Sequence, residues 1–132
     1  MSGRPKPIAS AMASFETWDI IKVPFPYTDR PVRQRRPALV IAAGQITQDH
    51  GLLWVAMITS AANRGWSGDV LISDISAAGL PIPSIIRPAK IATIDDRDAE
   101  LLGKLPPSDR AAVADWLRRL LAVVLSPRLR RR

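Results

Sequence analysis

The sequence has no cysteine and a single histidine, His50, among its 132 residues. The absence of cysteine excludes disulfides, thiolate metal sites and cysteine nucleophiles. One histidine alone cannot form a histidine-pair zinc site or a two-histidine acid–base site. Because it lies in a polar segment, we interpret His50 as a surface residue, and the sequence predicts neither a metal site nor a cofactor.

Long apolar runs are also missing, since none approaches the ~18 residues that a membrane span needs. The first 14 residues contain only a short apolar stretch interrupted by serine, which is unlike the core of a signal peptide. We interpret residues 1–14 as a disordered N-terminal extension. The missing cysteines and the missing signal together predict a cytoplasmic protein without a membrane partner.

The net charge of +7 is concentrated at the two ends of the chain. Arg4 and Lys6 lie near the start, and four arginines lie within residues 128–132. Removing these six charges from +7 leaves +1, so the central part of the chain is nearly neutral. The basic tail, residues 127–132, either attracts polyanions in a salt-dependent, sequence-independent way or is solvated without a specific partner.

Short apolar segments of strand length, separated by glycine, proline and polar turns, dominate the first three quarters of the chain. The expected strands are 19–23, 37–42, 52–59, 68–73, 84–87 and 90–94. The second and third are joined by a polar segment with a glycine, which predicts a hairpin at the centre of a sheet. This number of short strands at close spacing indicates a small barrel or a strongly twisted antiparallel sheet.

The C-terminal region changes to helical periodicity, and residues 96–102 could form a short helical turn before it. Its apolar positions are Val113, Trp116, Leu117, Leu120, Leu121 and Val124. They form one stripe of an amphipathic helix that Ser108 would cap and that Ser126-Pro127 would end. The sequence therefore predicts a single, mostly β domain over residues 15–126 with a terminal helix.

Two residues stand out as candidates for chemistry on a phosphodiester. Arg36 lies where a basic loop meets a buried strand, and Pro37 restricts it to extended conformations. Its guanidinium could stabilise a dianionic phosphorus centre through two parallel hydrogen bonds, although a solvated loop arginine is an equal alternative. Thr59 ends a buried strand, where its hydroxyl could donate to a phosphate oxygen or simply reflect β propensity.

The four tryptophans lie in different sequence surroundings, which predict different roles for them. Trp66, flanked by two small residues, is the best candidate for stacking on a base. Trp54 lies in an apolar strand and is predicted to belong to the core, while Trp18 and Trp116 are predicted to pack. The acidic cluster at 95–100 is interrupted by an arginine, so we interpret it as compensation of a helix dipole rather than as a magnesium site.

Several segments together resemble the MazF/PemK toxins. They are W-D-I-I-K-V-P-F-P-Y-T-D (18–29), R-R-P-A-L-V (35–40), I-T-S (58–60), G-D-V (68–70) and S-I-I-R-P-A-K-I-A-T-I-D (84–95). Many members of the family have glycine where this chain has Trp18, which indicates the subgroup whose loop reads P-F-P-Y/F-T-D.

This resemblance implies a bacterial toxin of a type II toxin–antitoxin system, with an SH3-like barrel and a C-terminal helix. The family implies a homodimer that cuts single-stranded RNA at specific sequences without metal and leaves 2′,3′-cyclic phosphate and 5′-hydroxyl ends. It also implies an antitoxin partner, and contact with DNA only through that antitoxin.

By motif match, the resemblance places the catalytic arginine at Arg36 and the catalytic hydroxyl at Thr59. An arginine stays protonated in proteins, so it fits electrostatic stabilisation of the transition state better than general-base catalysis. The candidate RNA-binding residues are Arg30, Arg33, Arg35, Ser60, Arg64, Trp66 and Lys90.

Two other functions remain open at the level of sequence. One is a non-catalytic toxin on the same barrel, like the gyrase-poisoning CcdB proteins, although the C-terminus here is basic rather than hydrophobic. The other is a basic RNA- or DNA-binding module that has lost catalysis.

Overall fold

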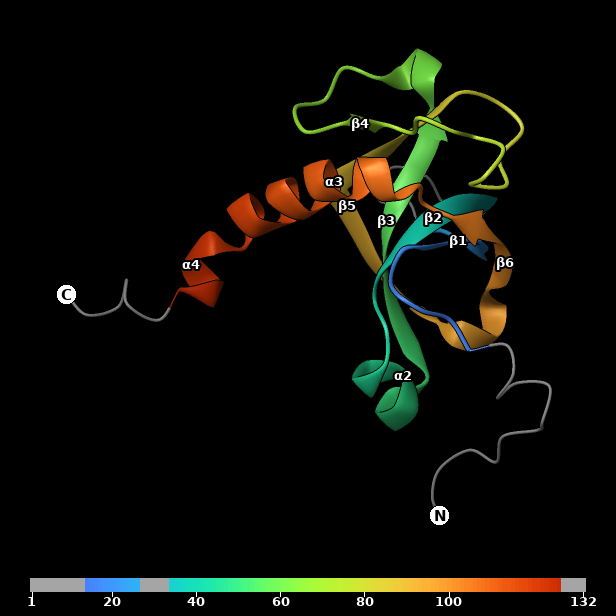
Figure 1. The fold of residues 1–132 in the computed structure, drawn as a ribbon. Helices are drawn as coiled ribbons and strands as arrows, with labels where there is room; N and C mark the ends of the chain where they lie inside the picture. The colour runs from blue at the N-terminus through green and yellow to red at the C-terminus, as the bar shows by residue number, and fades with distance from the viewer. Residues whose placement is uncertain (1–13, 27–33, 127–132) are drawn as a thin grey trace.

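A six-stranded antiparallel sheet forms the body of the molecule, and helix α3 (Pro107–Leu120) lies across it (Figure 1). The computed structural model describes residues 14–26 and 34–126. The strands are β1 (Asp19–Pro24), β2 (Arg35–Ala42), β3 (Leu52–Ser60), β4 (Val70–Leu71), β5 (Ser84–Asp95) and β6 (Glu100–Lys104). Their order in the sheet is β4-β5-β3-β2-β1-β6, and the sheet curls into a half-barrel. The predicted class, mostly β with a C-terminal helix, is confirmed.

The predicted central hairpin is present, because β2 and β3 pair antiparallel. A short helix, α2 (Gln45–His50), fills their connection and leaves His50 exposed. Strand β2 begins earlier than the apolar run suggested. Arg35 and Arg36 are part of it and pair with Pro24 and Val23 of β1, so the sheet holds the backbone of both arginines.

The two strands expected at 84–87 and 90–94 are one strand, β5, with a bulge. Arg87 pairs with Met57, whereas Ile91 pairs with the preceding residue, Ala56. Residues 88–90 are therefore extra on the β5 side. Pro88 has no N–H to donate to the ladder, and a bulge is where a strand accommodates such a residue.

The expected bounds of two further elements, the strand at 68–73 and the helical turn at 96–102, were wrong. Regular pairing at β4 covers only Val70–Leu71 rather than 68–73. The segment expected to form one helical turn contains a 3-10 turn, η2 (Asp96–Asp98), followed by strand β6, which pairs with β1. Strand β6 lacks an alternating pattern because it lies at the sheet edge and Leu101 is exposed.

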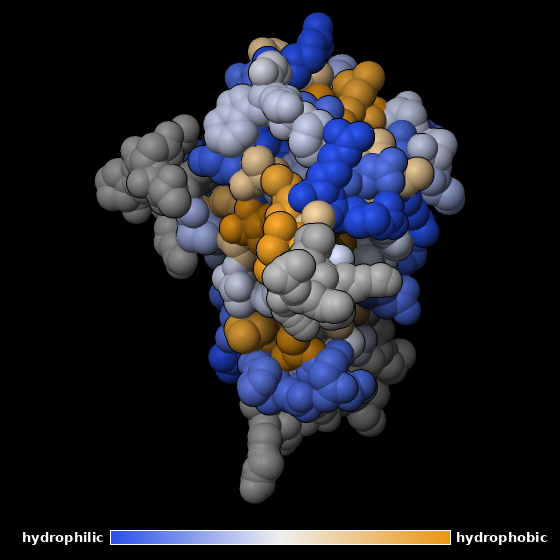
Figure 2. Space-filling model, turned by 90° about the vertical axis from the view of Figure 1, so that its left-hand side faces the viewer, coloured by the Kyte–Doolittle hydropathy of each residue, from blue (hydrophilic) through white to orange (hydrophobic). Residues whose placement is uncertain are grey.

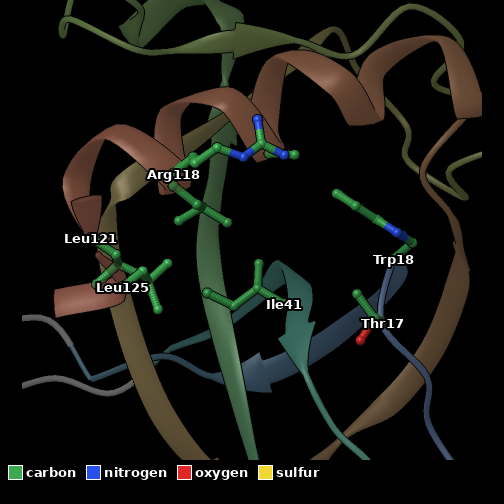
Figure 3. A pocket seen from close by; sticks show the side chains of 8 residues that line it. Thr17, Trp18, Ile41, Arg118, Leu121 and Leu125 are labelled. Atoms are coloured by element: carbon green, nitrogen blue, oxygen red, sulfur yellow. The ribbon is translucent and has the colours of Figure 1, made fainter. Parts of the chain in front are cut away.

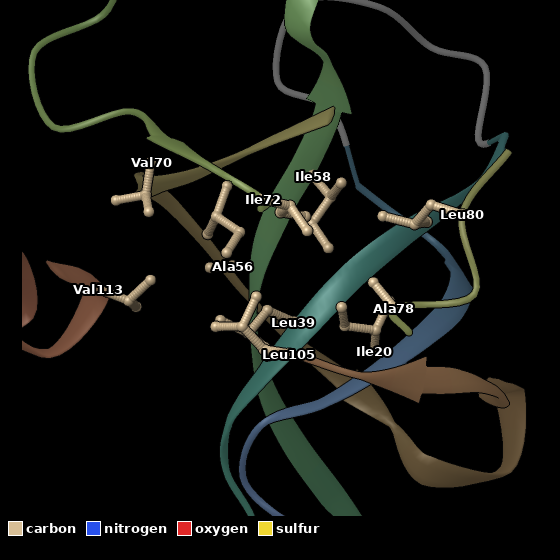
Figure 4. Close-up of a cluster of buried hydrophobic side chains, with 11 residues drawn as sticks. Ile20, Leu39, Ala56, Ile58, Val70, Ile72, Ala78, Leu80, Leu105 and Val113 are labelled. Carbon is tan, nitrogen blue, oxygen red and sulfur yellow. The ribbon is translucent and has the colours of Figure 1, made fainter. Parts of the chain in front are cut away.

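Both faces of the sheet carry apolar clusters, which explains why its strands read as continuous apolar runs. One cluster lies under α3 and includes Leu39, Ile58 and Val113 (Figure 4). The other face carries a second cluster that includes Val40 and Val55. Neighbouring residues of one strand thus enter different clusters, as the alternation of side chains in a strand requires.

Helix α3 begins differently from the expectation. Pro106 occupies the cap position and Pro107 the first turn, so Ser108 lies inside the helix and is not its cap. The carboxylate of Asp109 instead accepts hydrogen bonds from the backbone N and the hydroxyl of Ser73, at 2.9 and 3.1 Å. This contact ties the first turn of α3 to the segment that follows β4.

The apolar stripe of the C-terminal helix extends beyond the sheet that it covers. Val113 is buried, and Trp116 and Leu117 pack against the core, but Leu120 and Val124 are 52% and 79% exposed. The chain turns at Leu121 and continues as α4 (Ala122–Leu125). Among the described residues, no helix is long and apolar enough to cross a membrane.

The tryptophan predictions were partly right. Trp18 and Trp116 pack against the core as expected. Trp54 is 47% exposed, so its assignment to the core was wrong. Its neighbours Leu53 and Val55 are fully buried, and alternation along β3 turns Trp54 to the opposite side, where it lines a groove with Ile41 and Leu121.

Candidate active site

Strands β2 and β3 bring Arg36 and Thr59 to the same end of the sheet. Ala38 pairs with Met57, and two residues further along each antiparallel strand lie Arg36 and Thr59. Alternate residues of a strand share a face, so both side chains lie on the face of Ala38 and Met57. Arg36 is exposed and Thr59 is half-buried, so a charge and a hydroxyl lie at the same solvent-accessible end of the sheet.

The two adjacent arginines of β2 have different surroundings. Arg35 donates to the backbone oxygens of Asp98 and Lys22, both at 3.2 Å, and its guanidinium lies 3.5 Å from a carboxylate oxygen of Glu100. These contacts hold β2 to β1 and to the turn before β6. Arg36 points to the other face and donates to the side chain of Gln34 at 2.6 Å. A guanidinium has five N–H donors, so this contact alone does not saturate it.

The Thr59 hydroxyl is held by the turn that follows β3. This turn, η1 (Ala61–Asn63), is capped by the Ser60 hydroxyl, which accepts from the backbone N of Ala62 at 3.1 Å. Asn63 at its end donates from Nδ2 to Thr59 Oγ1 at 3.0 Å. Thr59 is therefore an acceptor in this contact, and its own hydrogen can be directed elsewhere.

A buried ion pair between Arg87 and Asp69 contacts the same turn. The side chains of Arg87 and Asp69 are only 7% and 8% exposed, and two hydrogen bonds of 2.9 Å join them. Hydrogen bonding from Arg87 lowers the pKa of Asp69, against the opposing effect of burial, and the backbone N–H groups of Trp66 and Gly65 lower it further. Arg87 Nη2 also donates to the backbone oxygen of Asn63 at 2.9 Å.

Sequence reasoning missed Asn63, Asp69 and Arg87 as parts of this site. The one available signal was an arginine in the otherwise apolar run S-I-I-R, because a buried arginine needs an acidic partner. Its partner lies 18 positions earlier in the chain, a separation at which sequence spacing carries no information about contact.

Trp66 and Lys90, both predicted to bind RNA, do lie together. The Arg87 guanidinium carbon is 4.3 Å from the centroid of the Trp66 ring, and Lys90 Nζ is 5.6 Å from it. Trp66 remains 48% exposed. Cations beside its ring orient the indole and make its surroundings attractive to an anion.

The other predicted RNA-binding residues are spread around this region. Ser60 caps η1, and Arg64, which is exposed, donates to the backbone oxygen of Ala61 at 3.3 Å. Arg30 and Arg33 lie outside the described residues.

The acidic cluster at 95–100 has a structural role. The Asp95 carboxylate accepts from the backbone N of Arg97 at 2.9 Å and caps η2, and it also pairs with the Arg97 guanidinium at 2.9 Å. Within residues 14–26 and 34–126, no three histidine, aspartate or glutamate side chains converge as metal ligands would.

A second surface lies beside the helices. A groove of about 250 Å³ is lined by Trp18, Ile41, Leu121 and Leu125, whose side chains point toward one another (Figure 3). It adjoins a groove of about 460 Å³ that shares Ile41 and Leu121 and adds Trp54. Seen from the side of α4, apolar residues gather at the middle of this face (Figure 2).

The sequence profile described as PemK-like, MazF-like toxin of type II toxin–antitoxin system matches residues 16–121. The chain belongs to this family. No curated protein matches the sequence of this MazF-like toxin. Its fold is similar to those of solved family structures, and the match extends over almost the whole length of each of those structures.

MazF from Deinococcus radiodurans is 24% identical with a TM-score of 0.67, over 83% of this chain and 97% of that chain. A MazE–MazF complex from the same organism gives 24% identity and a TM-score of 0.62, over 82% and 95% of the two chains. An endoribonuclease in complex with its cognate antitoxin from a mycobacterial species gives 15% and 0.62, over 80% and 93%. At these identities the comparison shows a shared fold.

Proposed function

We propose that this MazF-like toxin is a sequence-specific endoribonuclease that cleaves single-stranded RNA without a metal ion. The observation that carries this proposal is that Arg36 and Thr59 lie at the same end of the paired strands β2 and β3, on one face, two residues beyond the pair Ala38 and Met57. Membership of the family and the likeness to solved endoribonucleases support it.

In the proposed reaction the ribose 2′-oxygen attacks the adjacent phosphorus. The 2′-hydroxyl gives its proton to solvent water as the 2′-O–P bond forms, the bond from phosphorus to the 5′-oxygen breaks, and the departing oxygen takes a proton from solvent water. The products carry a 2′,3′-cyclic phosphate and a 5′-hydroxyl. Arg36 stabilises the extra negative charge that develops on the phosphate oxygens, and the Thr59 hydroxyl donates to one of those oxygens.

The RNA is proposed to continue from this edge towards Trp66. An unpaired base can stack on an exposed indole, and Lys90 beside the ring can contact a phosphate. Arg64 and Ser60 flank the path on the turn that holds Thr59. Arg30, Arg33 and Arg35 are proposed to attract the RNA backbone, with Arg35 also holding β2 to its neighbours.

Two protein partners complete the proposal. A cognate antitoxin is expected because related folds have been crystallised as a MazE–MazF complex and with a cognate antitoxin. Contact with DNA is proposed to occur only through that antitoxin. A second copy of this chain is expected on the exposed apolar face formed by Trp54, Ile91 and the end of the C-terminal helix.

The test is incubation of the purified protein with a long, largely unpaired RNA in the presence of EDTA. The proposal predicts a small set of defined fragments with 2′,3′-cyclic phosphate ends, and the same fragments when magnesium is added. Cleavage that appears only with magnesium would contradict the chemistry. Binding without cleavage under both conditions would favour a non-catalytic toxin or RNA-binding module on the same fold.

A further inference from the structure

A chain of hydrogen bonds connects the buried Asp69–Arg87 pair to the Thr59 hydroxyl, and Asn63 is its middle member. The backbone oxygen of Asn63 accepts from Arg87 Nη2 at 2.9 Å, and its side-chain Nδ2 donates to Thr59 Oγ1 at 3.0 Å. One exposed residue thus joins the buried charge pair to the hydroxyl that is proposed to donate to the phosphate.

The direction of the last hydrogen bond determines what Thr59 can do. A hydroxyl has one hydrogen to donate and two lone pairs that accept. Because Asn63 is the donor, it occupies a lone pair of Thr59 Oγ1 and leaves the hydroxyl hydrogen for another acceptor. Consecutive hydrogen bonds also polarise one another, so a donor to Oγ1 strengthens the hydroxyl as a donor in turn.

We propose that Asn63 is a positioning residue that aims the Thr59 hydroxyl hydrogen at a non-bridging oxygen of the scissile phosphate. This inference rests on the proposed function and assigns a part of its mechanism. Asn63 acts through Thr59 and does not itself touch the RNA at the reacting atoms.

The surroundings of Asn63 explain how its amide is held in place. The backbone N of Ala61 donates to the backbone oxygen of Pro83 at 2.9 Å, which ties η1 to the segment that enters β5. Asp69 fixes Arg87 from two sides and also accepts from the backbone N–H groups of Gly65 and Trp66, both at 3.1 Å. The turn is therefore anchored at its start and at its end, which fixes the backbone from which the Asn63 side chain reaches Thr59.

The experiment measures single-turnover cleavage at saturating RNA together with RNA affinity. Asn63→Ala should lower the cleavage rate about 3- to 10-fold, the effect of losing one hydrogen bond, with affinity nearly unchanged. Asn63→Asp keeps the shape but can only accept, so it draws the Thr59 hydrogen towards itself. It should lower the saturated rate more than Asn63→Ala does.

Thr59→Ala supplies the readout that a purely structural role would not give. In that background Asn63→Ala should cause no further loss of rate, because the group through which Asn63 acts is gone. Gln45→Ala is the matched control, since it removes another exposed amide hydrogen bond, to Asp49 at 2.7 Å, at the opposite end of β2. It should leave the rate unchanged.

Two results would overturn the inference alone while the wild-type protein cuts RNA. One is an Asn63→Ala rate equal to that of wild type, and the other is a loss that multiplies with that of Thr59→Ala. A wild-type protein that does not cut RNA would overturn the proposed function and this inference together.

Discussion

Two arginines on the same face of the sheet have opposite surroundings. Arg87 is buried and its charge is matched by Asp69, whereas Arg36 is exposed at the end of β2. Burying a charge is tolerated only with a well-placed partner, so Arg87 is committed to the structure. A phosphate needs a guanidinium with donors to spare, and Arg36 meets that condition.

Replacing Asp69 by Asn should therefore destabilise the protein by about 3 kcal/mol at neutral pH, because it leaves Arg87 buried without its counter-charge. Hydrogen bonding from Arg87 holds the pKa of Asp69 below the usual value of an aspartate in the folded protein. Its contribution to stability is thus complete above about pH 4 and is lost as the pH falls through that lowered pKa. Urea denaturation should show a large difference between the two proteins at pH 7 and a smaller one near pH 3.

Asp115→Asn is the matched control, since the Asp115–Arg118 pair spans one helical turn and both side chains are more than 60% exposed. Its effect should stay within about 0.5 kcal/mol at both pH values. Equal effects of the two substitutions would show that the Asp69–Arg87 pair is not the buried anchor described above.

At the scale of elements, the sequence predicted what local pattern determines. The apolar runs located β1, β2 and β3, and helical spacing located α3, because burial of these segments imposes a period on their residues. Strand β6 and the bulge at 88–90 escaped prediction because pairing partners determine them, and these lie far away in the sequence. Trp54 was misassigned because the residues of this run are apolar on both faces of the sheet. The sequence therefore does not mark the position at which one face becomes exposed to solvent.

For the candidate site, local context and the family resemblance together named Arg36 and Thr59, and its small neighbours singled out Trp66. The roles of these residues stay predictions. The links between them were not predictable. Asn63 reaches Thr59 only because η1 forms a tight turn, and Arg87 reaches the turn only because β5 runs beside β3.

At the scale of the whole molecule, apolar side chains of the C-terminal helix stay exposed in the part of the chain that the structure describes. Leu120, Leu121 and the residues of α4 are exposed, and Leu121 lines a groove with Trp54 and Ile91, which are also exposed. A contiguous apolar surface of this kind marks an interaction site. Its occupant is proposed to be a second copy of this chain.

Light scattering at tens of micromolar should accordingly give the mass of a dimer. Leu121→Glu should shift the protein to monomer, since a carboxylate in an apolar interface loses its hydration without gaining a partner. Leu101→Glu is the control, because Leu101 is also exposed, at 57%, but lies on edge strand β6. A wild-type monomer at this concentration would contradict the proposed pairing.

The role of Arg36 is the central claim, and single-turnover cleavage by Arg36→Ala at saturating RNA tests it most directly. Loss of one guanidinium that stabilises the transition state should lower the rate about 10²- to 10³-fold. The free energy of unfolding should change by no more than about 0.5 kcal/mol at this exposed position. Arg36→Lys should restore part of the rate, because it supplies the charge without the paired donors. Arg35→Ala, the neighbouring control, should keep nearly the full rate. A folded Arg36→Ala protein that cuts RNA at the wild-type rate would contradict the account.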